Sequence, residues 1–242
     1  MSVIGRPSPV LFMNVAIIAA AGQGTRLAST RPKQFLELSG TPIVFHTLKA
    51  FEECDSIQEI VVVLRAEDSS LFLSLAPKQN LKKLAKVVPG GVTRAESVLR
   101  GLQAVREATA EIVAVHDGVR PFVTPDEIAR TVVAAQEEGA AILVSTPVDT
   151  LKEVRDGAVL RTLDRADLRN ALTPQCFAYK LLRRAYEEVD VLDPSLTDES
   201  SLVERLGVRV VTVEGSARNI KITRPEDLAI GEAILKAVTS GQ

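Results

Sequence analysis

A short apolar run that leads directly into a glycine-rich loop constrains this sequence more than any other feature. Residues 15–20 are all apolar, and the letters AGQGTR follow at positions 21–26. Such a run is typical of a buried strand in a parallel sheet. Glycine lets a ligand approach the backbone closely, and successive free N–H groups in such a turn can bind an anion. The sequence therefore predicts an α/β fold with an anion site at the carboxyl end of its first strand.

Two cations in or near this loop, Arg26 and Lys33, favour a polyphosphate as the anion. Arginine can grip phosphate oxygens with two N–H groups, and lysine acts as a point charge. A dinucleotide-binding loop would need a third glycine where Leu27 stands, and no Gly-Lys-Ser/Thr of a P-loop follows. A plain structural turn remains the alternative.

The rest of the chain alternates between short apolar runs and amphipathic segments. Strands are expected at residues 15–20, 60–64, 85–88, 112–115, 140–146 and 208–213, and helices at 43–51, 94–105, 125–138, 180–189, 197–206 and 224–238. This alternation predicts a doubly wound, mainly parallel sheet of the Rossmann-like type. Residues 149–163 break the rhythm, because two extended runs flank Asp156 and Gly157 and indicate a β-hairpin. We expect this inserted hairpin to be an arm that clasps a second subunit in a homodimer.

Composition narrows the class of protein. The chain has 242 residues and a net charge of −2, which does not favour a nucleic-acid or membrane partner. Residues 13–240 are expected to form one domain, preceded by an extension at 1–12 that is either a start-site extension or a loose tail. Cys54 and Cys176 are interpreted as free thiols of a cytoplasmic protein, and no zinc-type cluster accompanies them. Secretion is disfavoured because cleavage after the small residues 19–21 would remove the first strand.

Asp117 directly follows a buried run, so its carboxylate should lie at the same sheet edge as the glycine loop. A carboxylate near a triphosphate favours a bridging Mg²⁺, and a turn-capping role before Gly118 is the alternative. His116 is expected to be packed or hydrogen-bonded rather than a base. Arg120 could pair with Asp117 or line the cleft.

Further polar groups interrupt apolar surroundings. A second glycine turn at residues 89–91 leads into a helix start, where Thr93 is expected to open a capping box and Ser97 could reach a base. Thr197 could be the N-cap of a helix or a ligand of the substrate. Arg165 and Lys221 are candidates for charges that face the cleft.

Six motifs in order resemble one family. They are AAGQGTR with PKQF (20–26 and 32–35), HDGVRP (116–121), Asp164-Arg165, LTPQ (172–175), TDE (197–199) and NIKITRPEDL (219–228). The first is similar to the signature of sugar-phosphate nucleotidyltransferases. The whole span from about residue 15 to 238 resembles the 2-C-methyl-D-erythritol 4-phosphate cytidylyltransferases of the non-mevalonate isoprenoid pathway. The ribitol-5-phosphate cytidylyltransferases share the first motifs and are the alternative.

The resemblance implies a role for each matching residue. Arg26, Lys33, Arg165 and Lys221 would act at the site of chemistry, and Asp117 would bind Mg²⁺. The residues that would hold CTP are Ala20, Ala21, Gly22, Gly24, Arg26, Lys33, Gly91, Arg94, Ser97 and Asp117. The residues that would hold the polyol phosphate are Thr150, reaching the partner subunit's substrate, Arg165, Thr173, Thr197 and Lys221. Val92 departs from the family, which often has a carboxylate there.

These residues suit phosphoryl chemistry without a base. The attacking phosphate is largely dianionic at neutral pH because its second pKa is about 6. The sequence therefore predicts a Mg²⁺-dependent enzyme that uses fixed positive charge to bring two anions together. A non-catalytic nucleotide-binding module is the rival class, but it would not need Lys33, Asp117 and Lys221 together.

Overall fold

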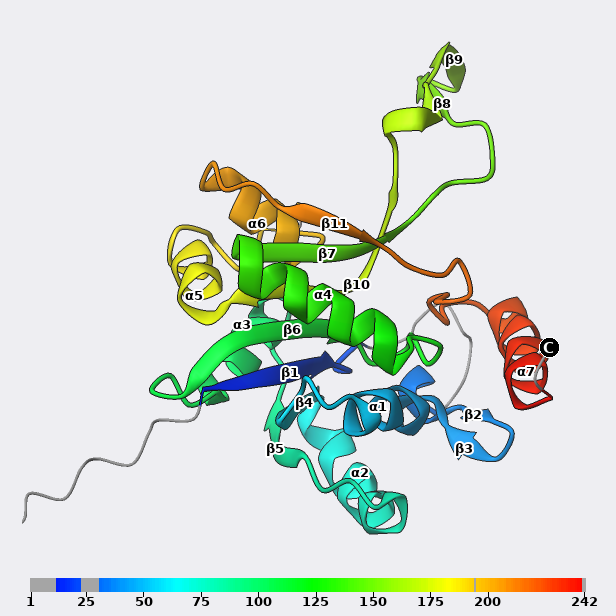
Figure 1. Ribbon diagram of the computed structural model, residues 1–242. Helices are drawn as coiled ribbons and strands as arrows, with labels where there is room; N and C mark the ends of the chain where they lie inside the picture. The colour runs from blue at the N-terminus through cyan, green and yellow to red at the C-terminus, as the bar shows by residue number, and fades with distance from the viewer. Residues whose placement is uncertain (1–11, 23–30, 194, 241–242) are drawn as a thin grey trace, which may run out of the picture.

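The computed structural model describes residues 12–22, 31–193 and 195–240. These residues form an α/β sandwich around one seven-stranded sheet in the order β11-β7-β10-β6-β1-β4-β5 (Figure 1). The strands are β1 Met13–Ala19, β4 Glu59–Leu64, β5 Leu84–Pro89, β6 Ala110–Asp117, β7 Ala140–Ser145, β10 Asn170–Ala178 and β11 Val211–Glu214. Every pairing is parallel except the two made by β10, which runs against β6 and β7. The expected mainly parallel, doubly wound sheet is confirmed.

The helices cover both faces of this sheet because successive strand residues point to opposite sides. The helices are α1 Ile43–Glu53, α2 Ser69–Leu75, α3 Arg94–Ala104, α4 Pro125–Glu138, α5 Tyr179–Glu187, α6 Glu199–Arg205 and α7 Pro225–Thr239. Helices α1, α2 and α4 pack on the face that carries Ile18 and Val62, whereas α3, α5 and α6 pack on the face of Ile17 and Val63. None of the helices among the described residues is long and apolar enough to cross a membrane.

Local signals explain where the helices begin and end. Thr124 caps α4 in a complete capping box with Glu127, and Gly139 ends the helix at φ 86°. Thr93 caps α3 as expected, but the box is incomplete because the Glu96 carboxylate accepts from the Val92 N–H instead.

Two expectations about the second half of the chain were wrong or incomplete. The N-cap of α6 is Asp198, not Thr197, because the Asp198 carboxylate accepts from the Ser201 N–H at 3.2 Å. Strand β10 was not expected, since residues 170–176 contain a proline and several polar side chains. Pro174 lies where the β10–β7 register shifts, so its missing N–H does not interrupt a regular ladder.

The expected hairpin is confirmed as a separate two-stranded sheet, β8 Lys152–Arg155 and β9 Ala158–Thr162. Asp156 and Gly157 form its turn with φ values of 50° and 78°. The hairpin projects from the body beyond β7 and β11, and we call it the arm (Figure 1). A small sheet of β2 Glu37–Leu38 and β3 Thr41–Pro42 lies on the other side, against α7.

Candidate active site

A cleft of about 530 Å³ opens at the carboxyl edge of the sheet, where β1, β4, β5 and β6 end. The strand register sets its floor, because Ala19 at the end of β1 lies beside Asp117 at the end of β6. Among the described residues the lining consists of Ala19, Ala20, Ala21, Gly22, Lys33, Gln34, Arg65, Gly91, Val92, Thr93, Arg94, Ser97, Asp117, Val119 and Lys221. The structure thus brings Gly22 of the first glycine loop and the second glycine turn into one hollow with residues from four other segments, at 33–34, 65, 117–119 and 221.

Asp117 is the charged centre of this cleft and is only 6% exposed. Its Oδ2 atom lies 2.9 Å from Lys221 Nζ and 3.4 Å from Arg120 Nε, and its Oδ1 atom lies 3.4 Å from Arg94 Nε. Burial works to raise the pKa of the Asp117 carboxyl, but Arg94, Lys221 and Arg120 outweigh it and hold the pKa well below its usual range. The carboxylate therefore stays ionised and three cations gather around it.

Lys221 reaches Asp117 from far along the chain because its segment is tied to the loop after β6. The Ile222 N–H donates to the Val119 carbonyl at 2.9 Å, and Arg120 Nη1 donates to the Asn219 carbonyl at 2.8 Å. The Asn219 side chain in turn donates to the Thr173 carbonyl. Of the two roles considered from sequence, Arg120 takes the first: it pairs with Asp117 and is not among the residues that line the cleft. It also braces the Lys221 segment, which the sequence did not indicate.

The second glycine turn is closed by its own side chains. The Ser97 hydroxyl accepts from the Gly91 N–H at 3.0 Å and donates to the Thr93 carbonyl at 2.8 Å. The Glu96 carboxylate accepts from the Val92 N–H at 2.7 Å and pairs with Arg100. Two N–H groups of the turn are therefore satisfied internally, so a ligand would meet this turn mainly through its carbonyls and its shape.

His116 and Thr173 lie behind the Asp117 backbone. The Thr173 hydroxyl accepts from the Asp117 N–H at 3.2 Å and lies 3.0 Å from His116 Nδ1, while His116 Nε2 lies 3.2 Å from the Arg120 carbonyl. Burial lowers the pKa of His116 to about 4. These contacts define a neutral, hydrogen-bonded histidine with its proton on Nε2, as expected from sequence.

A separate network supports the side of the cleft next to Lys33. The buried Asp68 carboxylate receives two hydrogen bonds from Arg65, at 2.8 and 3.0 Å, and one from Gln34 Nε2 at 3.1 Å. Lys33 begins the short helical turn Lys33–Phe35, and its ammonium end lies beside Gly22. Arg65 adds a cation to the cleft that the sequence patterns did not single out.

The structure gathers most of the candidate residues but not all of them. Those that line the cleft are Ala20, Ala21, Gly22, Lys33, Gly91, Arg94, Ser97, Asp117 and Lys221. Gly24 and Arg26 lie outside the described residues, as do residues 1–11 of the expected N-terminal extension. Thr173 is buried behind Asp117, and Thr197 is exposed just before α6.

Arg165 and Thr150 do not reach the cleft of their own chain. Both are exposed at the base of the arm, and the Arg165 guanidinium donates to the Val148 carbonyl. The expectation that Arg165 joins Lys221 within one chain is therefore not met by this arrangement.

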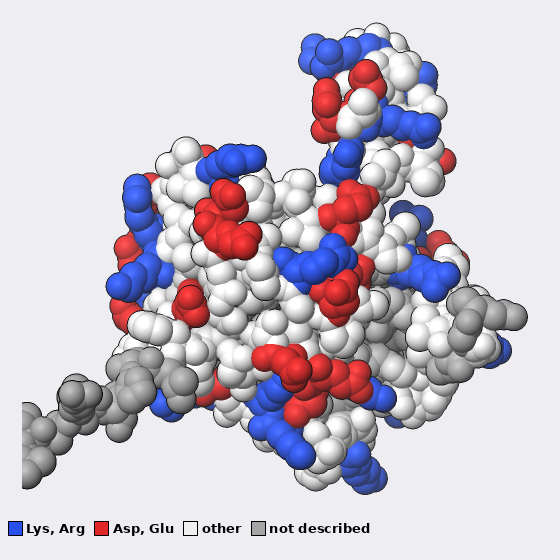
Figure 2. Space-filling view, in the orientation of Figure 1, with Lys and Arg blue, Asp and Glu red and all other residues white. Residues whose placement is uncertain are grey.

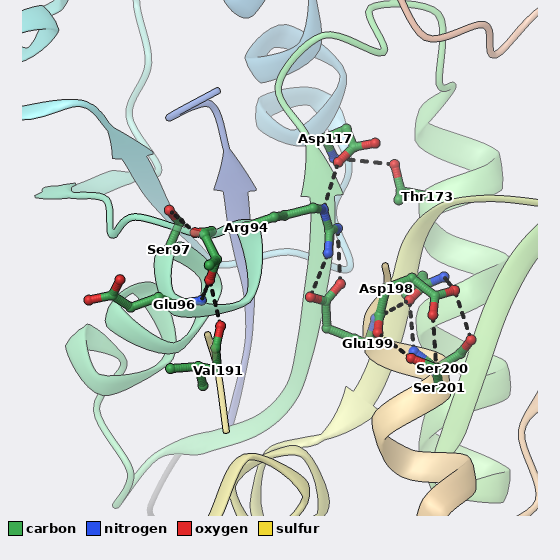
Figure 3. A network of polar contacts seen from close by, with 12 residues as sticks. Arg94, Glu96, Ser97, Asp117, Thr173, Val191, Asp198, Glu199, Ser200 and Ser201 are labelled. Atoms are coloured by element: carbon green, nitrogen blue, oxygen red, sulfur yellow. Dashed lines mark hydrogen bonds and ion pairs between the residues drawn. The ribbon is translucent and has the colours of Figure 1, made fainter. Parts of the chain in front are cut away.

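Sequence reasoning missed the carboxylate that holds Arg94. Glu199 accepts from Arg94 Nη1 at 2.7 Å and from Nη2 at 3.0 Å, although the two residues are 105 positions apart (Figure 3). A carboxylate in the first turn of a helix is favoured by the helix dipole in any case, so its position does not point to a partner such as Arg94. The only available signal was that Glu199 immediately follows the motif that contains Thr197.

Fold and site together define an α/β protein with a cleft lined by several cations at the carboxyl edge of a mainly parallel sheet, the edge at which such folds bind ligands. The sequence profile of the 2-C-methyl-D-erythritol 4-phosphate cytidylyltransferase family matches residues 14–237. The enzyme of that name from Bacillus cytotoxicus is 42% identical over 223 residues, which cover 92% of this chain and 98% of the relative. The enzyme from Syntrophus aciditrophicus is 43% identical over 224 residues, covering 92% and 95%.

Solved structures agree with the sequence relatives. The crystal structure of 4-diphosphocytidyl-2C-methyl-D-erythritol synthase from Anaerococcus prevotii superposes with a TM-score of 0.82 at 32% identity, over 93% of this chain and 99% of that one. The cytidylyltransferase from Thermus thermophilus gives a TM-score of 0.74 at 34% identity, over 93% and 100%. The chain belongs to the 2-C-methyl-D-erythritol 4-phosphate cytidylyltransferase family, and the resemblance inferred from its motifs is confirmed.

Proposed function

We propose that the cleft described above joins CTP to 2-C-methyl-D-erythritol 4-phosphate and releases pyrophosphate. The protein is a cytidylyltransferase, and its product is 4-diphosphocytidyl-2-C-methyl-D-erythritol, an intermediate of the non-mevalonate isoprenoid pathway. The site assignment rests on one observation: Lys33, Arg94 and Lys221 line the same cleft as Asp117, and Arg94 and Lys221 pair with its carboxylate.

The nucleophile needs no general base. A phosphate monoester is largely dianionic at neutral pH, because its second pKa is about 6. His116 is buried, hydrogen-bonded at both ring nitrogens and has a pKa of about 4, so it is not placed to take a proton. The barrier lies instead in the repulsion between two anions and in the charge that develops on the departing pyrophosphate.

Fixed cations on two sides of the cleft would lower this barrier. Lys33, beside Gly22 of the first glycine loop, would stabilise charge on the phosphates of CTP, together with Arg26. Lys221 would hold the attacking phosphate from the opposite side, next to Asp117. Ala20, Ala21, Gly91 and Ser97 would shape the space for the nucleoside.

Asp117 would supply the protein ligand for Mg²⁺. It is the single carboxylate in the described lining of the cleft, and no group of three His, Cys, Asp or Glu side chains that could hold a metal occurs among the described residues. One carboxylate suits Mg²⁺ when phosphate oxygens complete the set, as they would with CTP. When bound, such an ion would supply positive charge that neutralises part of the charge on the phosphates.

The arm suggests a homodimer. Its strands pair only with each other among the described residues, and Val154 and Val159 are 56% and 60% exposed. Thr150 and Arg165 at its base would reach the acceptor phosphate in the partner subunit's cleft, which explains why neither enters its own. The buried, unpaired thiols of Cys54 and Cys176 suit a reducing compartment, and we place the enzyme in the cytoplasm on that basis.

A pyrophosphate-release assay with CTP and Mg²⁺ tests the proposal. We expect release with 2-C-methyl-D-erythritol 4-phosphate and at most a small fraction of that rate with ribitol 5-phosphate. Chelation of Mg²⁺ should abolish release. A preference for ribitol 5-phosphate would contradict the acceptor assignment, and binding of CTP with no release with either acceptor would make the protein a nucleotide-binding module.

A further inference from the structure

Glu199 is a buried carboxylate that the proposed mechanism has not used. It occupies the first turn of α6 and is 1% exposed. Both of its oxygens accept from Arg94, at 2.7 and 3.0 Å, and one also accepts from the Tyr186 hydroxyl at 3.1 Å. A bidentate pair of this kind fixes the plane of the guanidinium as well as its position.

The first turn of α6 is bonded to β10 as one unit. Gln175 Oε1 accepts from the N–H groups of Glu199 and Ser200, each at 3.0 Å, and Gln175 Nε2 donates to Asp198 Oδ2 at 2.9 Å. Asp198 also caps the helix through the Ser201 N–H (Figure 3). Glu199 therefore moves only together with this turn of α6, and Arg94 follows it.

Arg94 connects this turn of α6 to the cleft. Its Nη atoms face Glu199, while its Nε lies 3.4 Å from Asp117 Oδ1 (Figure 3). Burial disfavours the charged guanidinium, but the two carboxylates outweigh it and raise the pKa of Arg94 above its ordinary value. One cation is thus shared between a carboxylate that lines the cleft and one that lies behind it.

We propose that Glu199 is a positioning residue that acts through Arg94 to couple nucleotide binding to acceptor binding. Glu199 lies two residues after Thr197, which the family resemblance assigns to the acceptor, and its partner Arg94 lines the cleft. An acceptor contact at Thr197 acts on this same turn of α6, so any shift of the turn is passed to Glu199 and, through it, to Arg94. The inference rests on the proposed function for the identity of the two ligands.

The charge of Glu199 also affects Asp117. Without it, Asp117 would be the nearest carboxylate left for Arg94, and the two would pair more tightly. Asp117 would then be less free to receive the nucleotide with its ion, and Arg94 would turn away from the nucleotide. Both consequences weaken nucleotide binding, and neither depends on a change in the fold.

The test is the Glu199→Gln variant, which keeps the size of the side chain and one oxygen acceptor. Affinity is measured calorimetrically with the α,β-methylene analogue of CTP, which cannot release pyrophosphate, in the presence and absence of 2-C-methyl-D-erythritol 4-phosphate. In the unaltered enzyme the acceptor should tighten analogue binding about fivefold or more, a typical coupling between sites. In Glu199→Gln the analogue alone should bind about tenfold more weakly, and the tightening by the acceptor should disappear.

Glu127→Gln is the matched control. Glu127 is also a buried carboxylate that serves a helix start, and it accepts from the Thr124 and Ser216 N–H groups away from the cleft lining. Its loss should lower the melting temperature but leave analogue affinity and coupling unchanged. An equal loss of affinity in both variants would reduce Glu199 to a structural residue and overturn the proposal.

A double-mutant cycle separates action through Arg94 from an independent effect. If Glu199 acts through Arg94, Arg94→Ala with Glu199→Gln should bind the analogue no more weakly than Arg94→Ala alone; additive losses would overturn the proposal. Tyr186→Phe removes one hydrogen bond to Glu199 and should weaken analogue binding about twofold to threefold. If Glu199→Gln does not fold, Tyr186→Phe replaces it as the test. Analogue binding as tight as in the unaltered enzyme would then contradict the proposal.

Different results would contradict the proposed function and the proposed coupling. If the unaltered enzyme does not form pyrophosphate from CTP and the acceptor, the ligand assignment is wrong. If it turns over normally but the acceptor does not tighten analogue binding, only the coupling is wrong.

Discussion

The cleft at the end of the sheet and the arm differ in what their side chains touch. In the cleft, Arg94, Asp117 and Lys221 are charged groups held by one another and by buried neighbours. On the arm, the charged residues lie on the surface among uncharged ones, and valines and a leucine are left exposed (Figure 2). The described part of the cleft is built within one chain, whereas the apolar side chains of the arm pair, among the described residues, only across the hairpin and stay largely exposed.

This difference separates two tasks in the same reaction. A preorganised set of charges favours catalysis because it needs little rearrangement when charge develops. An arm with exposed apolar residues favours association with another surface. Substitutions in one region should therefore disturb its task and leave the other task largely intact.

The largest effect is expected in the cleft. Lys33→Ala should lower kcat by at least ~10²-fold, the scale of losing one electrostatic stabiliser. Steady-state pyrophosphate release measures it, with Lys49→Ala as control because Lys49 is an exposed residue of α1 that pairs only weakly with Glu53. A kcat close to that of the unaltered enzyme would remove Lys33 from the mechanism.

Burial of His116 behind the cleft should make folding stability depend on pH. Its pKa is about 4 in the fold and 6.5 when exposed, so the unfolded chain binds the extra proton first as pH falls. The free energy of unfolding should therefore fall by up to ~3 kcal/mol between pH 6.5 and pH 4. Denaturant unfolding of the ligand-free protein at a series of pH values measures this dependence. In His116→Gln the free energy of unfolding should change less with pH. An unchanged pH dependence in the variant would show that other groups cause it.

Disturbing the arm should separate the subunits without unfolding the body. Val154→Asp with Val159→Asp places two charges on the exposed arm, and we expect this double variant to be a monomer. Its activity should fall about tenfold, because Thr150 and Arg165 of the partner subunit would no longer help to orient the acceptor. Light scattering gives the mass, and the melting temperature reports on the body. Val133→Asp on α4, an exposed valine away from the arm, is the control. A dimer that persists in the double variant would show that the arm is not the interface.

The smallest effects compare Gly90, which packs against the cleft residue Ala21, with a glycine of the arm. A Cβ on Gly90 would lie 2.4 Å from Ala21 Cβ, so Gly90→Ala should destabilise the fold by about 1–3 kcal/mol through overpacking and raise KM for CTP. A Cβ on Gly157 meets nothing within 4 Å, but φ is 78°, so Gly157→Ala should cost about 1 kcal/mol from backbone strain alone. Chemical denaturation and KM measurements would distinguish the two, and a KM change in Gly157→Ala would contradict the separation of the regions.

Local signals explain which features could be predicted from the sequence. Asp156 and Gly157 fix the hairpin turn by their own backbone preferences, and Thr124 with Glu127 fixes the start of α4. The position of Asp117 followed from a buried run and the rule that ligands bind at the carboxyl edge of such sheets. These inferences depend on residues that are neighbours in sequence.

The features that were missed depend on contacts between distant segments. Strand β10 contains Pro174 and polar residues, and it is a strand because β6 and β7 supply partners on both sides. Asp198 rather than Thr197 caps α6, and the contacts of Gln175 with Asp198, Glu199 and Ser200 fix that choice. Likewise, Glu199 acquires its importance only from Arg94, and Arg65 enters the cleft only because Asp68 holds it.

The central claim is that cations fixed around Asp117 bring two anionic substrates together in one cleft. The most direct measurement is a crystal structure with the α,β-methylene analogue of CTP, Mg²⁺ and 2-C-methyl-D-erythritol 4-phosphate. We expect Lys33 and Lys221 to lie within hydrogen-bond distance of the nucleotide phosphates and the acceptor phosphate, respectively, with Asp117 on the ion. Phosphates bound elsewhere, with Lys221 still paired to Asp117 and no ligand between them, would contradict the account.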